Sequence, residues 1–353
     1  MTNQSPPSSA TATRVPLQQT PLLQVLDLTK HFSLSSRPAS WLSRQQKVQR
    51  LHAVDGVTLS IQPGESVGLV GESGCGKSTL IRLIARLMEP TAGKILFNNT
   101  SIDQIPVGVF SRSPHRADLQ MVFQDHTDSL NPRFTAFDTI TEPIKRLGPA
   151  YTKKQLRSRA AELAQLVGLP GELLSRFPHQ LSGGQKARVG IARAIALNPK
   201  LLILDEPTSA LDVSVQAVIL HLLTDLKQRL NMSYLFISHD LNVVRLLCDR
   251  ILVMYLGKLV ETGPTDTVFN RPHHPYTQAL ISAIPSFAAT PHRIPLTGEP
   301  RSPINPDPTV CRLYGRCPKG DDRCQQVQPD LRAISDNHQV ACHYPEMLRS
   351  SRA

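Results

Sequence analysis

The stretch GESGCGKS, residues 71–78, limits what this chain can fold into more than any other part of the sequence. It fits the pattern G-x-x-x-x-G-K-[ST], follows the apolar run ESVGLV and closely precedes the helix-periodic run LIRLIARLM. Glycines let such a loop curl with its N–H groups inward, and the N-terminus of the next helix favours negative charge. Lys77 can reach the β- and γ-phosphates of a nucleotide, and the Ser78 hydroxyl can ligate Mg²⁺. We therefore expect a strand, a phosphate-binding loop and a helix here.

Three more short apolar runs end in polar residues, namely LQMVFQ, LLILDEP and YLFISHD. Continuous apolar runs of this length are typical of parallel strands buried on both faces, and their carboxyl ends share one edge of the sheet. The candidates at that edge are Gln124 for metal and water, Asp205 for Mg²⁺, Glu206 for polarising an attacking water, and His239 for the γ-phosphate. The alternatives are a solvated acidic turn, an ordinary strand-end amide and a structural histidine.

The amino-acid composition narrows the classes of function that are open to the chain. The net charge of +11 fits a solvated basic surface or an anionic partner. A single Trp and 5 % aromatic residues argue against a base-stacking platform for nucleic acid. No window approaches the ~20 uncharged apolar residues of a membrane span, and the N-terminus shows no secretory signal. We expect a cytosolic protein with reduced thiols.

Several changes in composition suggest boundaries along the chain. The polar residues 1–20 are predicted to be disordered. Residues 22–32 are predicted to form a strand, 33–50 a surface loop, and 251–263 a hairpin that turns near Gly257. From about residue 271 the chain becomes Pro-rich and is predicted to form a separate appendage. The expected domains are 21–265, an α/β unit, and 266–353, a small irregular extension that contains four cysteines.

Together these motifs resemble those of the ATP-binding-cassette (ABC) ATPases, in the family's order, over residues 22–265. GESGCGKST resembles Walker A, LLILDE resembles Walker B, and the segments at Gln124 and His239 resemble the Q-loop and the switch-histidine loop. LSGGQ, residues 181–185, resembles the signature motif of the family, and SALD, ending in Asp212, resembles its D-loop. The resemblance implies a P-loop NTPase fold: a RecA-like parallel sheet core, an antiparallel β subdomain and a helical subdomain inserted at about 125–195.

By the same resemblance, the ligands are ATP and Mg²⁺, and Glu206 is the general base of ATP hydrolysis. Gln124 and His239 complete the catalytic group, while Ser78, Gln124 and Asp205 would hold Mg²⁺. The residues assigned to ATP binding are Phe32, Gly71, Glu72, Ser73, Gly74, Cys75, Gly76, Lys77, Ser78 and Thr79. Phe32 matches the aromatic residue that stacks on adenine in the family. The alternative role for Phe32 is core packing at the end of its strand.

In this family two cassettes pair head to tail, so that the signature of one covers the ATP held by the other. Here the signature consists of Leu181, Ser182, Gly183, Gly184 and Gln185. Because this motif opens a helix, its hydroxyl and amides are suited to a γ-phosphate. The chain has one phosphate loop and one signature. The resemblance therefore implies a second ATPase subunit, which we expect to be a paralogue.

Two further stretches, VFQDHTDSLNPRFTAFDTITEP and NRPHHPYTQALISAIP, resemble the ATPases of oligopeptide, dipeptide and nickel importers, and the region LHAVDGVTLS looks more like the second of their two ATPases. The resemblance implies a peripheral subunit on the cytoplasmic face of the membrane that energises uptake of oligopeptides, dipeptides or a similar small solute. Its further partners would be two integral membrane permeases and, indirectly, an extracytoplasmic solute-binding protein. Coupling helices of the permeases would dock near Phe134 and Phe137, unless residues 125–145 are only a connecting loop.

Four of the six cysteines lie in the last 43 residues: Cys311, Cys317, Cys324 and Cys342. No C-x-x-C pair is present, so a zinc ribbon fits poorly, whereas four thiolates in an irregular segment suit a [4Fe–4S] cluster. Some related importer ATPases carry such a cluster. A Cys₄ zinc site and simple buried cysteines remain alternatives, with His343 as an outside candidate ligand. A small segment with few apolar residues needs an additional cross-link, such as a bound metal, to be stable. This favours a metal site over simple buried cysteines.

Two other functions compete with transport. The first is a soluble ABC protein that acts on ribosomes or nucleic acid; the net charge of +11 favours it, but such proteins usually carry two cassettes or a long coiled coil, and neither is visible here. The second is a nucleotide-binding module without turnover, which the intact Glu206, His239 and LSGGQ oppose. We therefore expect a transport ATPase and no nucleic-acid partner.

Overall fold

The computed structural model describes residues 20–34, 49–285 and 293–345. The segment predicted to be disordered, 1–20, lies outside this range except for its last residue, and most of the predicted loop at 33–50 lies outside it as well.

Four strands form an antiparallel sheet, in the order β2 (Arg50–Ile61), β1 (Leu23–Ser33), β4 (Ala92–Phe97) and β5 (Thr100–Ser101). A second, mixed sheet has the order β11 (Arg332–Ser335), β12 (His338–Val340), β10 (Lys258–Pro264), β9 (Arg250–Tyr255), β3 (Ser66–Val70), β8 (Ser233–Ile237), β7 (Leu201–Asp205) and β6 (Leu119–Val122).

The parallel core predicted from the apolar runs is present. Strands β6, β7, β8, β3 and β9 pair in parallel with their neighbours. All five residues of each of β3, β7 and β8 are buried. Within β7, Leu201 and Ile203 face one hydrophobic cluster, and Leu202 and Leu204 face the other. This alternation with period two explains why the strand is apolar throughout: each face of the sheet is covered.

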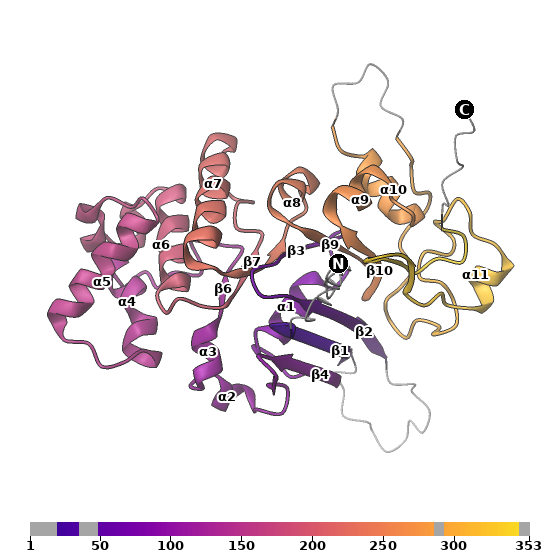
Figure 1. Ribbon diagram of the computed structural model, residues 1–353. Coiled ribbons are helices and arrows are strands. Elements are labelled where there is room, and N and C mark those ends of the chain that lie inside the picture. The colour runs from indigo at the N-terminus through magenta and orange to yellow at the C-terminus, as the bar shows by residue number, and fades with distance from the viewer. Residues whose placement is uncertain (1–19, 35–48, 286–292, 346–353) are drawn as a thin grey trace, which may run out of the picture.

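Different layers cover the two faces (Figure 1). On one face, α1 (Lys77–Ile84) and the antiparallel sheet share a core with β3 and β7. On the other face lie α7 (Val213–Leu230), α8 (Leu241–Leu247), α9 (Thr265–Asn270) and α10 (Pro275–Ser282). Short helices α2 (Val107–Phe110) and α3 (Pro114–Asp118) lead from the antiparallel sheet into β6.

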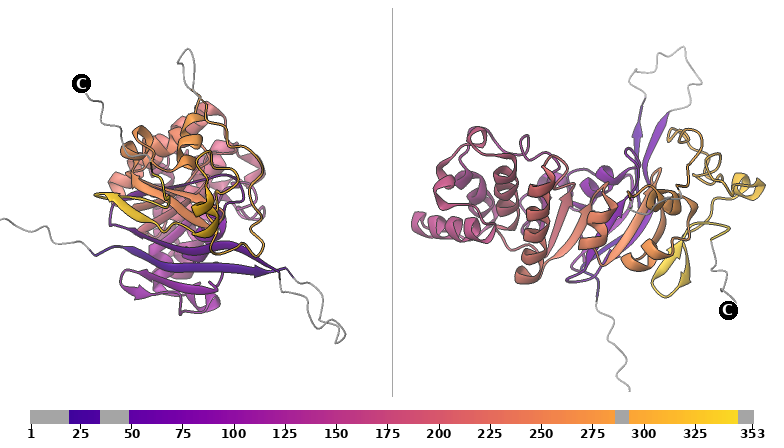
Figure 2. Two further views of the ribbon diagram at one scale, coloured as in Figure 1. Left: turned by 90° about the vertical axis from the view of Figure 1, so that its right-hand side faces the viewer. Right: turned by 90° about the horizontal axis from the view of Figure 1, so that it is seen from above.

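Between β6 and β7 the chain is helical, as expected for about 125–195. This part contains α4 (Ala136–Leu147), α5 (Lys153–Leu166), α6 (Gly183–Ile195) and the 3₁₀ turns η1 (Gly171–Ser175) and η2 (Pro178–Gln180). Each of the three α-helices starts with a capping box, formed by Thr135 with Asp138, Thr152 with Gln155, and Ser182 with Gln185. Figures 1 and 2 show this helical part at one end of the molecule and the C-terminal extension at the other.

The predicted hairpin at 251–263 is present as β9 and β10, with Leu256 and Gly257 at its turn in left-handed conformations (φ 41° and 83°). The expectation of a separate C-terminal appendage is wrong. Strand β12 pairs with β10, with Glu261 opposite Val340, so the extension continues the main sheet. Helices α9 and α10 form the first part of the extension, and a third short helix, α11 (Asp322–Gln326), lies near the cysteines. None of the described helices combines the length and the apolar character needed to cross a bilayer.

Candidate functional site

The phosphate loop joins β3 to α1, and two of its three glycines are required by space as well as by backbone conformation. Gly71 and Gly76 have φ values of 152° and 110°. A Cβ atom on Gly71 would lie 2.2 Å from the carbonyl oxygen of Met254, and one on Gly76 would lie 2.1 Å from that of Ala53. Only glycine fits such contacts with backbone atoms. The loop is thus pressed against β9 and β2.

Lys77 is almost fully buried, and its Nζ points back into the loop. It donates to the carbonyl oxygens of Gly71 at 2.7 Å and of Glu72 at 3.0 Å. Cys75 is also buried, with its Sγ 3.8 Å from Nζ, and burial raises the pKa of its thiol. The ammonium therefore lies inside the curl of the loop, where a bound phosphate would need a positive charge.

Three polar side chains that follow separate strands meet at one atom. Gln124 Nε2 donates to Glu206 Oε2 at 3.1 Å, and His239 Nδ1 lies 3.2 Å from the same oxygen. Glu206 has a left-handed backbone (φ 44°), which turns the chain sharply after β7. The sequence placed these residues at one edge of the sheet, and the structure shows that they are in direct contact. The arrangement can hold a water molecule against a carboxylate and a neighbouring amide.

Asp205 ends β7 and is 4 % exposed. Its Oδ1 is buried without a hydrogen-bond partner among the described residues. Burial and the negative charge of Glu206 raise the pKa of Asp205 to about 6, although Arg82 and Lys77 oppose the shift. A buried carboxylate oxygen without a partner is costly unless a cation or a proton satisfies it. The site therefore fits a divalent cation, which Asp205 and Ser78 could hold together with phosphate oxygens.

A pocket of about 440 Å³ opens beside the phosphate loop. Its lining contains the predicted residues Phe32, Ser73, Gly74, Gly76, Lys77, Ser78, Thr79, Gln124, Glu206 and His239. It also contains residues that the sequence analysis missed: Leu51, His52, Ala53, Leu256, Gly257 and Pro303. Pro303 comes from the C-terminal extension, where its carbonyl oxygen accepts from the N–H group of His52 at 2.9 Å. No sequence signal connects positions this far apart in the chain.

Phe32 lines the pocket, and the Nζ of Lys30 lies 5.2 Å from the centre of its ring. Its neighbour His31 faces away from this lining, with Nε2 3.2 Å from Asp55 Oδ1. Phe32 thus borders the same pocket as the phosphate loop, while the histidine takes part in a separate cluster. This position fits a base that stacks on the ring.

That cluster brings three donor atoms of His31, His52 and Asp55 within 4.8 Å of one another. Two cations already pair with the carboxylate of Asp55: Arg312 contacts it directly, and Lys258 Nζ lies 3.7 Å away. A divalent ion would have to bind beside two fixed positive charges. We therefore interpret the cluster as an ion-pair network that joins β1, β2 and the C-terminal extension.

The signature residues lie elsewhere. Ser182 is the N-cap of α6, where its Oγ accepts from the N–H group of Gln185, and it is exposed. Neither Leu181–Gln185 nor Asp212, which is exposed before α7, lines the pocket that contains the phosphate loop. Within one chain the structure therefore does not bring the phosphate loop and the signature together. This separation is what a site shared between two chains requires.

The four cysteines of the extension line one hollow, together with His274, Tyr314 and His343. All four are free thiols. Burial raises the pKa of Cys311 to about 11, and burial also raises the pKa of Cys317, Cys324 and Cys342. Convergence of four thiols on one space fits a thiolate-bound group, which would lower these pKa values. No three of their sulfurs come within 4.8 Å of one another.

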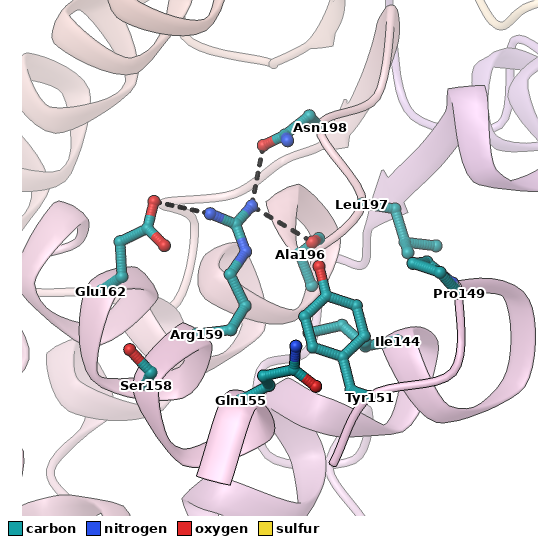
Figure 3. Close-up of a pocket in the computed structure, with 10 residues that line it drawn as sticks. All are labelled: Ile144, Pro149, Tyr151, Gln155, Ser158, Arg159, Glu162, Ala196, Leu197 and Asn198. Carbon is teal, nitrogen blue, oxygen red and sulfur yellow. Dashed lines mark hydrogen bonds and ion pairs between the residues drawn. The ribbon is translucent and has the colours of Figure 1, made fainter.

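A second hollow, of about 450 Å³, lies in the helical part (Figure 3). Tyr151, Ile144, Pro149 and Leu197 give it an apolar lining, and the charge of Arg159 is held at its side. The guanidinium donates to Glu162 at 2.7 Å, to Asn198 at 2.9 Å and to the carbonyl oxygen of Ala196 at 3.3 Å. The hollow thus combines apolar residues with fixed polar groups, and a concave site of this kind can receive a side chain from a partner.

A curled glycine loop with a buried lysine, and an Asp-Glu pair, a glutamine and a histidine at the ends of parallel strands, define a P-loop ATPase of the ABC class. Comparison with known proteins agrees. The family "ABC transporter" matches residues 54–209, and the family "Oligopeptide/dipeptide transporter, C-terminal region" matches residues 260–324. The chain belongs to the family of ABC transporter ATP-binding proteins, and it is an ATPase that uses ATP.

Curated relatives cover nearly the whole chain. A probable peptide ABC transporter ATP-binding protein, y4tS, of Sinorhizobium fredii is 47 % identical over 91 % of this chain and 89 % of its own length. The oligopeptide transport ATP-binding proteins AppF of Bacillus subtilis and OppF of Salmonella typhimurium are each 44 % identical over 92 % of this chain, and over 98 % and 96 % of their own lengths.

Solved structures share the fold. The dimeric cassette MJ0796, in a post-hydrolysis state bound to ADP and Pi, is similar with a TM-score of 0.60 and 29 % identity; the match covers 69 % of this chain and 98 % of that one. The cassette cbiO1 of Clostridium perfringens, part of the ABC transporter complex cbiONQ, has a TM-score of 0.59 and 29 % identity over 71 % and 91 % of the two chains. These matches confirm the predicted fold class.

Proposed function

We propose that this chain is the ATP-hydrolysing subunit of an ABC importer for oligopeptides, dipeptides or a similar small solute such as a nickel complex. The observation that carries the proposal is the contact of Gln124 and His239 with Glu206 beside the phosphate loop, in a chain 43–47 % identical to peptide transport ATPases. These relatives favour import over an action on ribosomes or nucleic acid. The peripheral cytoplasmic location follows from that role.

In the proposed mechanism, Glu206 accepts a proton from the attacking water, and His239 donates a hydrogen bond to the γ-phosphate. Gln124 orients the water through its contact with Glu206. Mg²⁺ supplies positive charge to the phosphates, and Asp205, Ser78 and Gln124 are the residues that would hold it. The unpartnered Oδ1 of Asp205 supports this assignment.

We further propose that ATP is enclosed only when a second cassette pairs head to tail. The exposed Ser182 would then meet the γ-phosphate held by the partner, with the N–H groups of Gly183 and Gly184 at the start of α6. Asp212, exposed before α7, is suited to the contact between the two chains. We expect this partner to be a paralogue of the chain.

Two membrane permeases and an external solute-binding protein would complete the importer. We propose that short permease helices dock on α4 and α5. Phe137 and Ile144 lie seven residues apart on α4, hence on one face of the helix, and Ile144 lines the hollow of Figure 3. Phe134, half-buried just before α4, extends this surface. Gln124, at the start of the segment that leads there, could pass the state of the nucleotide to the permeases.

For the cysteine hollow we propose a [4Fe–4S] cluster, with a Cys₄ zinc site as the alternative. In a tetrahedral zinc site with Zn–S bonds of ~2.3 Å the sulfurs would lie about 3.8 Å apart, whereas no three of these sulfurs lie within 4.8 Å of one another. What supports the cluster is the convergence of four thiols from an irregular segment on one hollow. Its expected role is structural or regulatory.

The test of the function combines Glu206→Gln with Ser182→Ala. Glu206→Gln should bind ATP and associate with the partner cassette but hydrolyse ATP about 10²- to 10⁴-fold more slowly, because the general base is lost. Ser182→Ala should slow hydrolysis at the site of the partner and leave nucleotide binding by its own phosphate loop unchanged. Both are measured with reconstituted importer in vesicles. Full-rate hydrolysis by an isolated monomer, indifferent to Ser182, would overturn the proposal.

A further inference from the structure

The phosphate loop carries a carboxylate although the ligand that it is expected to bind is an anion. Glu72 is the second residue of the loop, and its side chain is one-third exposed. A negative charge within the loop disfavours phosphates, since like charges at short range repel. Its N–H group is also occupied, because it donates to Tyr276 Oη at 2.7 Å. The structure must therefore neutralise and hold Glu72 for the loop to bind an anion well.

The partner of Glu72 comes from the four-cysteine segment. Arg316 Nη1 lies 3.0 Å from Glu72 Oε2, and Nη2 lies 3.3 Å from Oε1, so the guanidinium grips both carboxylate oxygens. Nη1 also donates to Tyr255 Oη at 3.1 Å. The Arg316 side chain is only 10 % exposed, which limits screening by solvent.

Arg316 is held in place by the turn between the first two cysteines of the hollow. The N–H groups of Arg316 and Cys317 both donate to the carbonyl oxygen of Leu313 at 3.0 Å. The N–H group of Cys311 donates to the carbonyl oxygen of Cys324 at 2.8 Å. The guanidinium thus points from a backbone framework built by the cysteine segment to the phosphate loop, 244 residues away in the sequence.

We propose that Arg316 is a positioning residue for the ATP site, which neutralises and orients Glu72 and makes nucleotide affinity depend on the folding of the cysteine segment. The inference rests on the proposed function only for the identity of the ligand. It is tested by nucleotide binding, whereas that function is tested by hydrolysis, so the two can fail separately.

The experiment is a double-mutant cycle on the full chain, read as the Kd of a fluorescent trinitrophenyl-ATP. Arg316→Ala should weaken binding about ten-fold by leaving Glu72 uncompensated, and in the E72Q background the same change should cost less than about two-fold. Arg316→Lys, which keeps the charge without the two-pronged grip, should lie between. Arg301→Ala removes an exposed arginine of the same extension and should have no effect.

Equal effects of Arg316→Ala in both backgrounds, or no effect in either, would overturn the proposal. Circular dichroism checks that each variant is folded. If Arg316→Ala does not fold, Arg316→Lys takes its place in the double-mutant cycle. The proposed dependence of nucleotide affinity on the cysteine segment is tested with Cys317→Ser. It should weaken binding several-fold with Glu72 present and little in the E72Q background, and an equal loss in both would refute the link.

Discussion

Glu261 is a fully buried carboxylate in β10 that ties the extension to the core. It accepts from the N–H groups of His273 and His274 at 2.8 and 3.0 Å, and His338 Nε2 lies 2.8 Å from its Oε1. Burial raises the pKa of such a carboxyl, but these hydrogen bonds outweigh burial and hold the pKa of Glu261 below its ordinary value of 4.5. The folded protein therefore favours the ionised form.

A pH dependence of stability follows at this residue. Because the folded-state pKa of Glu261 is depressed, the stability that it contributes is present above pH 4.5 and is lost as the pH falls through the folded-state pKa. Glu261→Gln should lower the free energy of unfolding at pH 7 by about 2–4 kcal/mol and lessen the loss on acidification. Thermal denaturation at pH 7 and pH 4 measures both, with the exposed Glu299→Gln as control. An unchanged acid response in Glu261→Gln would contradict this assignment.

At the scale of elements, α4 and α5 border the surface on which we propose that the permeases dock. They pack on α6 through Ile140 and Leu163, which are buried, while Phe134, Phe137 and the hollow beside Tyr151 remain accessible. Because α6 begins with the signature, a permease helix seated here would act on the helix that the partner cassette must approach.

Phe134→Asp combined with Phe137→Asp should abolish co-purification with the permeases, because burying two carboxylates in an apolar contact costs several kcal/mol. ATP binding should be unchanged, since neither phenylalanine lines the nucleotide pocket. Val218→Asp, at an exposed apolar position on α7, is the matched control and should leave the complex intact. A complex that still assembles with both phenylalanines replaced would show that docking occurs elsewhere.

In the whole molecule, the C-terminal extension is fastened to the ATPase at separate places. β12 extends the sheet at β10, Arg312 pairs with Asp55, and Arg316 pairs with Glu72. After α10, the described part of the extension has little regular structure apart from α11, β11 and β12. A bound cluster would add the cross-links that so few apolar residues cannot supply.

Anaerobic purification should yield protein with the absorbance of an iron–sulfur cluster, and Cys324→Ser should lose it while Cys248→Ser, at a buried thiol outside the hollow, keeps it. Removing the metal should lower Tm by several degrees, since each kcal/mol is worth roughly 2–4 °C in a protein of this size. Metal analysis decides between iron and zinc. Colourless, metal-free protein with four titratable thiols would leave only simple buried cysteines.

Much of the site could be predicted because its motifs are local. The phosphate loop, Asp205, Glu206, Gln124 and His239 each follow an apolar run, and parallel strands place such ends at one edge of a sheet. The sequence by itself therefore determined the fold class and the nucleotide chemistry. It could not show that Gln124 and His239 touch the same carboxylate oxygen, because side-chain packing sets those distances.

Only the tertiary structure decided how the extension relates to the ATPase. The pairings of β12 with β10 and of Arg316 with Glu72 join segments about 80 and 244 residues apart, and their energy comes from burial and charge neutralisation rather than from local propensity. A Pro-rich composition is therefore a poor guide to how such a segment is attached. Long-range contacts leave no period or spacing in the sequence, and for this reason the extension looked separate there although it contacts the phosphate loop.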